Sequence, residues 1–350
     1  MSHPADQLST ADLKVFRILD ANLDRAREGL RILEDWCRFG LDHHDLTDKL
    51  KHLRQSLGQW HTAELRAARD TPNDTGTSIT HPQEQVRTSV TQVLQANFCR
   101  VEEALRSLEE FGKIHHPDMA AACKQWRYQI YALESEVMGR HRWQQLLKAQ
   151  LYLVTSPSPN LLSVVESALK GGLSLVQYRA KTGDDCDRLV MAQQLSDLCH
   201  QYGALFLIND RVDLALAVDA DGVHLGQQDL PIATARKLLG SDRLIGRSTT
   251  NPEELAKALA EGADYVGVGP VYATPTKPDK AAAGLDYVRY AAANSPVPCY
   301  AIGGIDAQNL DEVMAAGGDR VAVVRALMQS PDPAITSQQF ITRLQAATTS

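Results

Sequence analysis

Groups that commonly bind phosphate follow one of the short apolar runs in the C-terminal part of the chain. The run at residues 264–268 is of the kind that forms a buried strand, and it leads to Thr274, Thr276 and Lys277. Threonine hydroxyls and a lysine ammonium can both donate hydrogen bonds to phosphate oxygens. This segment is therefore a candidate phosphate site, although an ordinary loop is the alternative for these residues taken alone.

Two carboxylates and several cations follow other apolar runs. Asp210 and Asp229 come after neighbouring runs, and Mg²⁺ often bridges one or two carboxylates to substrate phosphates. Arg179, Lys181 and Lys277 could neutralise a diphosphate, and a guanidinium can bind two oxygens at once. These residues predict a magnesium ion at Asp210 and Asp229 beside a diphosphate.

A glycine pair after the seventh apolar run suggests a second anion site. Gly303 and Gly304 allow backbone N–H groups to approach an oxyanion without a side chain in the way. We expect a helix to begin near Asp306, and helix N-termini attract anions. Arg325, after the eighth run, is a further candidate cation for this site.

Each of these residues also has an ordinary structural explanation. Asp210 and Asp229 could cap helices, the charged side chains could lie on the surface, and the two glycines could form a simple turn. The joint pattern favours a site because all of these residues fall at the same end of successive strands. His200 and His224 have no partner at metal-ligand spacing, so we predict structural roles for both.

The elements that position these residues alternate regularly between strand and helix. Amphipathic stretches separate the apolar runs, a pattern that indicates a parallel sheet, and eight units are the number that closes a (β/α)₈ TIM barrel rather than an open doubly wound sheet. A barrel places its active site at the carboxyl ends of its strands, where the polar residues occur. The expected strands are residues 151–155, 173–178, 204–208, 222–225, 243–246, 264–268, 297–302 and 320–324.

The N-terminal part has a different, purely helical pattern. Eight of the fifteen positions from 21 to 35 recur 75 positions later, which indicates a helical domain with internal twofold symmetry. A polar loop from Arg69 to Ser78 separates the two copies. We predict an α/β protein in which a TIM barrel, residues 149–350, follows a small all-helical domain, residues 1–125, with a linker helix at residues 126–148.

Composition excludes several classes of protein. The 350 residues carry a formal charge of −7, which argues against a nucleic-acid surface, so any anion site must be local. The six cysteines show no zinc-binding spacing, and the expectation is reduced thiols in the cytoplasm. Neither a secretory signal nor a membrane-spanning apolar run is expected, and the predicted partners are small molecules.

Six motifs of the C-terminal part, in register, resemble thiamine-phosphate synthase. They are Gln177-Tyr178-Arg179-Ala180-Lys181, Ile208-Asn209-Asp210, His224-Leu225-Gly226-Gln227-Gln228-Asp229, Gly246-Arg247-Ser248, Thr274-Pro275-Thr276-Lys277 and Ala301-Ile302-Gly303-Gly304-Ile305. Such enzymes are (β/α)₈ barrels that join hydroxymethylpyrimidine diphosphate to a carboxythiazole phosphate, releasing diphosphate and CO₂. In that family a small residue commonly stands where this chain has Arg325, which puts the details of the phosphate site in question.

The resemblance implies a role for each motif. It implies that Mg²⁺ binds to Asp210 and Asp229, and that the catalytic side chains are Arg179, Lys181, Ser248 and Lys277. The pyrimidine diphosphate would contact Gln177, Tyr178, Arg179, Ala180, Lys181, Asn209, Ser248 and Lys277, and the thiazole phosphate would contact Thr274, Pro275, Thr276, Gly303 and Gly304. The nearest alternative is a barrel isomerase of the thiazole tautomerase type.

The helical part resembles a small domain associated with hydroxymethylpyrimidine-phosphate kinases. The resemblance rests on the repeated Ala-Asn-x-x-Arg-x-x-Glu-x-Leu-Arg pattern and on the loop that begins at Arg69. It implies ATP as a further ligand, although the sequence contains no Gly-x-x-x-x-Gly-Lys loop. A dimerisation or docking module is the alternative for this domain.

Overall fold

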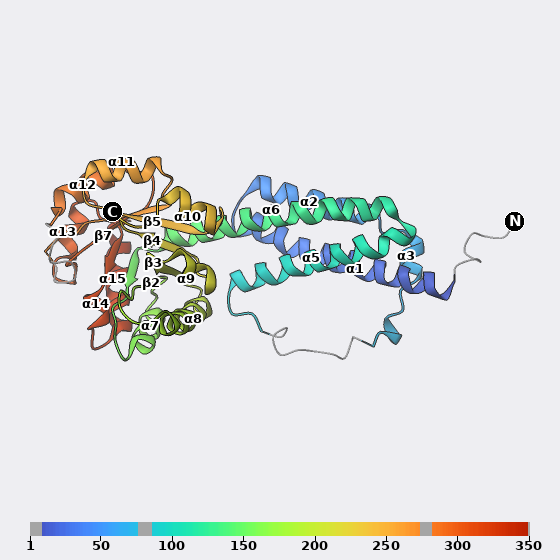
Figure 1. Cartoon of the computed structure of the whole chain (residues 1–350), viewed down its shortest axis with the longest axis horizontal. Coiled ribbons are helices and arrows are strands. Elements are labelled where there is room, and N and C mark those ends of the chain that lie inside the picture. The colour runs from blue at the N-terminus through green and yellow to red at the C-terminus, as the bar shows by residue number, and fades with distance from the viewer. Residues whose placement is uncertain (1–8, 76–85, 274–281, 349–350) are drawn as a thin grey trace. The chain divides into compact units, whose positions relative to one another are not determined.

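The computed structural model describes residues 9–75, 86–273 and 282–348 (Figure 1). Contacts divide the chain into two compact units, Met1–Met138 and Gly139–Ser350. Within the described ranges, no helix is long and apolar enough to cross a lipid bilayer.

The first unit consists of helices, as predicted. Its long helices are α1 (Thr10–Phe39), α2 (His44–Gln59), α5 (Val90–His115) and α6 (Pro117–Lys148), with the short α3 (Ala63–Ala67) and the 3₁₀ turn η2 (Thr71–Asn73) between α2 and α5. Helix α1 begins with a capping box, in which Ser9 and Asp12 satisfy each other's backbone N–H groups. Buried leucines at helical spacing on α1, α2 and α5 form the core of this unit.

The sequence repeat corresponds to two similar helix pairs, α1–α2 and α5–α6. In the first pair, the buried Glu34 accepts a hydrogen bond of 2.7 Å from Arg54 on α2. In the second pair, Glu109 is buried in the same way and accepts hydrogen bonds of 3.2 and 3.0 Å from Arg127 on α6. The repeated glutamates therefore link the two helices of each pair. They do not only form ion pairs along the exposed face of a single helix.

Helix α6 runs through the region where sequence patterns suggest a domain boundary. Ile130, Leu133 and Val137 lie beyond the proposed border at residue 125, yet they belong to the hydrophobic core of the helical unit. The contact division falls later, after Met138. The functional domain limits remain a prediction, and a fragment that keeps this core intact has to extend to residue 138.

The second unit contains a closed parallel barrel whose strands follow chain order, so the open-sheet alternative is wrong. The eighth strand pairs with the first, in register from Leu151 opposite Val321. All eight predicted strands are present within a few residues: β1 (Leu151–Val154), β2 (Leu175–Tyr178), β3 (Leu205–Asn209), β4 (Gly222–Leu225), β5 (Leu244–Thr249), β6 (Tyr265–Val268), β7 (Cys299–Ile302) and β8 (Val321–Val323).

Helices surround the barrel. They are α7 (Leu161–Lys170), α8 (Asp185–Gln201), α9 (Val212–Ala217), α10 (Ile232–Leu239), α11 (Pro252–Ala260), α12 (Gly284–Asn294), α13 (Leu310–Ala315), α14 (Arg325–Met328) and α15 (Pro333–Thr348). Successive strand residues face opposite sides, so Leu151 and Leu153 pack in the large core shared with the helices, while Tyr152 and Val154 pack in a smaller cluster inside the barrel.

The end of the barrel at the amino termini of the strands is closed by a buried ionic network. Arg142, in the part of α6 that belongs to the second unit, donates a hydrogen bond of 2.8 Å to Asp221. The imidazole of His200 lies 3.0 Å from the other oxygen of Asp221, which also accepts from the backbone N–H of Phe206. His200 is therefore structural, as predicted.

Candidate active site

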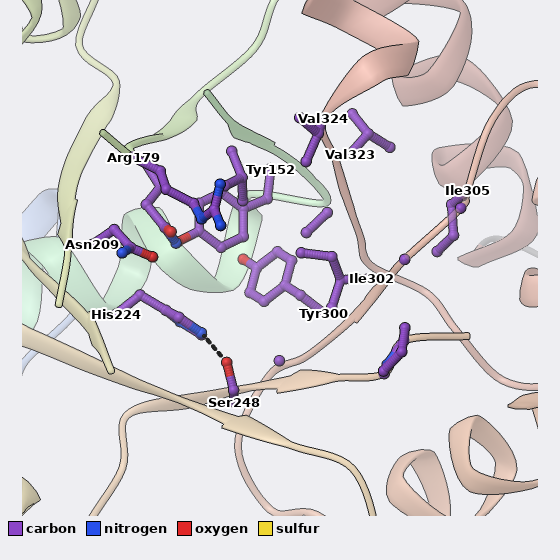
Figure 2. Close-up of a pocket in the computed structure, with 18 of the residues that line it drawn as sticks. Tyr152, Arg179, Asn209, His224, Ser248, Tyr300, Ile302, Ile305, Val323 and Val324 are labelled. Atoms are coloured by element: carbon purple, nitrogen blue, oxygen red, sulfur yellow. Dashed lines mark hydrogen bonds between the residues drawn. The ribbon is translucent and has the colours of Figure 1, made fainter. Parts of the chain in front are cut away.

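A cavity of about 390 Å³ opens at the carboxyl ends of the barrel strands (Figure 2). Strand alternation turns the polar residue at the end of several strands inward, because the neighbouring apolar residues face the helices. The structure brings nine of the predicted site residues together in its lining: Gln177, Arg179, Lys181, Asn209, Asp210, Asp229, Ser248, Gly303 and Gly304.

Other predicted residues do not line this cavity. The side chain of Tyr178 is buried in the core between the barrel and its helices, and Ala180 packs against the same core. Both alternate with inward-facing residues along β2 and its extension, so their side chains do not line the cavity, and the expected contact of these two residues with the pyrimidine diphosphate remains a prediction. Thr274, Pro275, Thr276 and Lys277 lie outside the described residues.

The two carboxylates lie next to each other in the cavity. Asp210 has a positive φ of 64°, and its backbone N–H donates to the carbonyl of His224 at 2.9 Å, which fixes the turn after β3. Burial raises the pKa of the Asp210 carboxyl, and so does the neighbouring Asp229, while Lys181 at 3.4 Å opposes the shift. Paired carboxylates with one partial counter-charge form an oxygen-rich site that suits a divalent cation.

Neither aspartate acts as a helix cap, so that alternative is wrong. Helix α9 starts after Arg211 and helix α10 after Pro231, and neither start has a side-chain cap. Asp229 instead accepts a hydrogen bond of 2.6 Å from the backbone N–H of Gly226. The side chain of Asp229 also interacts with that of Asp210.

Two arginines contribute positive charge without a protein counter-ion. Arg179 and Arg325 both line the cavity, and neither guanidinium forms an ion pair or hydrogen bond with any residue that the structure describes. Arg325 is the first residue of α14, directly after β8, and it is exposed. Guanidinium groups that face a cavity unpaired are suited to bind phosphate oxygens from the solvent.

The glycine pair forms a close backbone turn. Gly303 and Gly304 have φ angles of 109° and 70°, in the left-handed region. A Cβ on Gly303 would lie 2.6 Å from Pro270, and one on Gly304 would lie 2.8 Å from Tyr272, so neither position accommodates a side chain. Both glycines also line the cavity, so their backbone borders the space in which the predicted oxyanion would lie.

The helix expected near Asp306 begins later. Asp306 accepts hydrogen bonds from the backbone of Gln308 at 2.8 Å and of Asn309 at 3.3 Å, which makes a turn, and α13 starts only at Leu310. The helix N-terminus is thus displaced from the glycine pair by this turn. Ile305 and Asp306, rather than the first residue of α13, line this side of the cavity.

The floor of the cavity is a set of residues that sequence reasoning missed. His224, predicted to be purely structural, lines the cavity, and its Nε2 lies 2.8 Å from the hydroxyl of Ser248 (Figure 2). Tyr152 and Tyr300 line the same floor from β1 and β7. Strand alternation could have identified these residues from the sequence, because they occupy inward-facing positions of their strands.

The fold and this cavity define a (β/α)₈-barrel enzyme suited to phosphorylated substrates. Residues 151–327 match the thiamine monophosphate synthase family, and residues 17–136 match a family described as the ThiD2 family. The chain belongs to the thiamine monophosphate synthase family. It is therefore a transferase of thiamine biosynthesis, as the sequence motifs predicted.

Relatives that match over nearly the whole chain share both of its parts. A thiamine-phosphate synthase of Nostoc sp. is 64% identical over 344 residues, 98% of each chain. A thiamine-phosphate synthase of Synechocystis sp. is 64% identical over 330 residues, 94% of this chain and 96% of that one. The crystallised thiamine phosphate pyrophosphorylase of Pyrococcus furiosus is 35% identical, with a TM-score of 0.53, and covers 58% of this chain and 98% of its own.

Proposed function

We propose that the cavity binds hydroxymethylpyrimidine diphosphate and a carboxythiazole phosphate together and joins them to give thiamine phosphate, with release of diphosphate and CO₂. One observation supports this assignment: a carboxylate pair lines the same cavity as the glycine pair and as Arg179, which has no counter-ion among the described residues. A tautomerase-type isomerase needs a general base but no cation-binding carboxylate pair beside a diphosphate, so the site favours the synthase.

In the proposed reaction, the pyrimidine diphosphate lies at the ends of β2 to β5. Arg179 and Lys181 contact the diphosphate, and Gln177, Asn209 and Ser248 contact the rest of this substrate. Asp210 and Asp229 hold Mg²⁺, which supplies positive charge to the diphosphate oxygens. As the C–O bond to the diphosphate breaks, negative charge gathers on the leaving group, and the fixed guanidinium of Arg179 stabilises it.

The thiazole phosphate lies at the opposite side of the cavity, at Gly303, Gly304 and Arg325. Its ring nitrogen attacks the methylene carbon of the pyrimidine, which the aminopyrimidine ring stabilises as a cation. Holding both substrates in one cavity makes this capture effectively unimolecular. In the described residues of the cavity no cysteine lines the wall, and the reaction requires no nucleophilic side chain.

Mixing the purified chain with both substrates tests this proposal directly. With Mg²⁺ present, we expect thiamine phosphate, diphosphate and CO₂ in equal amounts, and chelation of the metal by EDTA stops their formation. A chain that rearranges the carboxythiazole phosphate alone, without consuming the pyrimidine diphosphate, would instead be an isomerase.

For the helical unit, the proposed activity is phosphorylation of hydroxymethylpyrimidine phosphate by ATP, which supplies the diphosphate that the barrel consumes. The supporting observation is a polar cluster formed by α1 and the segment that follows α2. Asp20 and His61 are buried and lie 2.5 Å apart, while Asp24 completes a group whose ligand atoms all lie within 4.8 Å of one another. The two carboxylates of this group are oxygen donors of the kind that Mg²⁺ prefers, so they suit the metal of a magnesium–nucleotide complex.

Arg69, from the polar loop identified in the sequence, binds this cluster. Its guanidinium donates hydrogen bonds of 2.6 and 3.0 Å to the two oxygens of Asp20 and also contacts Asp24. Burial of Asp20 opposes ionisation, but the hydrogen bonds from Arg69 and His61 outweigh it, so its pKa lies below the ordinary value. The Asp20 carboxyl is thus ionised at neutral pH, and in the proposed reaction Arg69 would contact a phosphate group of the nucleotide.

The kinase proposal predicts ADP formation by the full chain in the absence of the thiazole substrate. With ATP, Mg²⁺ and hydroxymethylpyrimidine phosphate, we expect ADP and the pyrimidine diphosphate, and Asp20→Asn should lower the rate at least tenfold, on the order expected for lost charge stabilisation. Arg106→Ala is the matched control, because Arg106 is an exposed α5 residue outside the cluster. No ADP from a folded, synthase-active chain would favour the docking module.

A further inference from the structure

The floor of the cavity contains a continuous chain of hydrogen bonds through the interior of the barrel. The amide Nε2 of Gln177 donates to the hydroxyl of Tyr152, which lies 3.0 Å from the hydroxyl of Tyr265. Tyr265 lies 3.1 Å from Nδ1 of His224, and Nε2 of His224 lies 2.8 Å from the hydroxyl of Ser248. Five strands, β1, β2, β4, β5 and β6, contribute one residue each.

The direction of donation follows from the first bond. An amide nitrogen can only donate, so the oxygen of Tyr152 accepts and its own proton is left for Tyr265. By the same reasoning, Tyr265 accepts from Tyr152 and donates to Nδ1 of His224. Burial raises the pKa of both phenols above the ordinary value, so each phenol stays protonated and donates a hydrogen bond to the next group in the chain.

The consequence for the imidazole is a defined tautomer. If Nδ1 of His224 accepts a hydrogen bond, the ring proton is on Nε2, which then donates to Ser248. The hydroxyl oxygen of Ser248 is an acceptor in this bond, and its own proton has no acceptor among the residues that the structure describes. Ser248 is partly exposed and lines the cavity, so this proton is directed toward bound substrate.

The backbone of the neighbouring strands is shaped around this chain. A Cβ on Gly246 would lie 2.1 Å from the ring of Tyr265, so the absence of a side chain on β5 makes room for this phenol. A Cβ on Gly267 would lie 3.3 Å from the ring of His224. Two glycines at inward-facing positions therefore leave room for the rings of Tyr265 and His224, which belong to the buried polar network.

We infer that Gln177, Tyr152, Tyr265 and His224 form a directional relay that makes Ser248 a hydrogen-bond donor to the pyrimidine diphosphate. Tyr265 and His224 are positioning residues in this scheme, because they act on the substrate only through Ser248. The relay selects a substrate that presents an acceptor atom to Ser248. The last step rests on the proposed function, whereas the direction of the relay does not.

Nuclear magnetic resonance of the ¹⁵N-labelled full chain without substrate tests the direction. We expect a neutral His224 ring with its proton on Nε2, assigned by loss of its signals in His224→Gln. Tyr265→Phe should move the proton distribution toward Nδ1. Tyr300→Phe should leave it unchanged, because this equally buried phenol donates instead to the carbonyls of Leu146 and Ala149. A wild-type proton on Nδ1 would overturn the relay.

Kinetics test the step to the substrate. Ser248→Ala should lower kcat/KM for the pyrimidine diphosphate about fivefold, the value of one ordinary hydrogen bond. Tyr265→Phe should lower kcat/KM when Ser248 is present, but it should cause no further loss in a chain that already carries Ser248→Ala. A purely structural effect of Tyr265→Phe would instead lower kcat/KM equally in both chains. Additive losses would overturn the relay, and Tyr152→Phe repeats the test if Tyr265→Phe does not fold.

If Ser248→Ala left kcat/KM unchanged while His224 had the expected tautomer, the proposed contact between Ser248 and the substrate would be wrong. The proposed function is judged separately, because it stands or falls with thiamine phosphate formation by the unaltered chain.

Discussion

Asp229→Ala is expected to lower kcat for thiamine phosphate formation by roughly 100-fold or more, a loss typical of removing one preorganised electrostatic group. The carboxylates of Asp210 and Asp229 lie together in the cavity, and Lys181 forms an ion pair of 3.4 Å with Asp210. Removal of either aspartate would leave too few anionic ligands to hold Mg²⁺ against the diphosphate. The measurement is kcat at saturating substrates across a magnesium titration.

The control for this substitution is Asp197→Ala. Asp197 is exposed in the second half of α8 and does not line the cavity, so its removal should leave kcat within about twofold, as for ordinary surface substitutions. Calorimetric titration of each variant with Mg²⁺ and inorganic diphosphate gives a second readout. If Asp229→Ala kept kcat within a few-fold of the normal value, the proposed metal role would be wrong.

Arg179→Ala is expected to have an effect of similar size, again mainly on kcat. Because its guanidinium faces the cavity and has no counter-ion in the described ranges of the chain, its full charge is available to the leaving diphosphate. That charge grows as the C–O bond breaks, so the interaction strengthens in the transition state and its loss should lower kcat by about 10²-fold.

Arg179→Lys separates charge from geometry. Lysine restores the charge but not the two parallel hydrogen bonds of a guanidinium, so we expect partial recovery. Arg289→Ala is the matched arginine control, since Arg289 pairs with Asp286 on α12 and does not line the cavity. A variant in which only the KM for the thiazole phosphate rises would place Arg179 with the other substrate.

The barrel could be predicted from sequence because its signals are local. Each apolar run is short enough to be a strand and is followed by polar residues, and all eight runs became strands of one closed sheet. The same local rule located Asp210 and Asp229 in one cavity, since parallel strands end at a common rim. Chain order and strand length were sufficient for these inferences.

Side-chain direction and non-local partners were harder to predict. Tyr178 was grouped with its motif, although alternation along β2 turns it toward the helices. His224 seemed to lack a partner because its contacts, Ser248 and Tyr265, are 24 and 41 residues away in the chain. The start of α13 was misjudged because Asp306 caps a turn by the same hydrogen bonds that can begin a helix.

The two helix pairs of the N-terminal unit bear on ligand stoichiometry. Both copies have a buried glutamate, Glu34 or Glu109, that pairs with an arginine of the following helix, whereas the residues around Asp20 are not repeated. At the positions that correspond to Asp20 and Asp24, the second copy has Gln95 and Cys99.

The second copy also differs in charge. Glu102 stands where the first copy has Arg27, and burial together with the nearby Glu134 raises its pKa to about 7. A copy with these residues lacks the aspartate–histidine–arginine arrangement of the first copy. If the helical unit is the proposed kinase, its internal symmetry therefore does not extend to the proposed site, and we expect one nucleotide per chain rather than two.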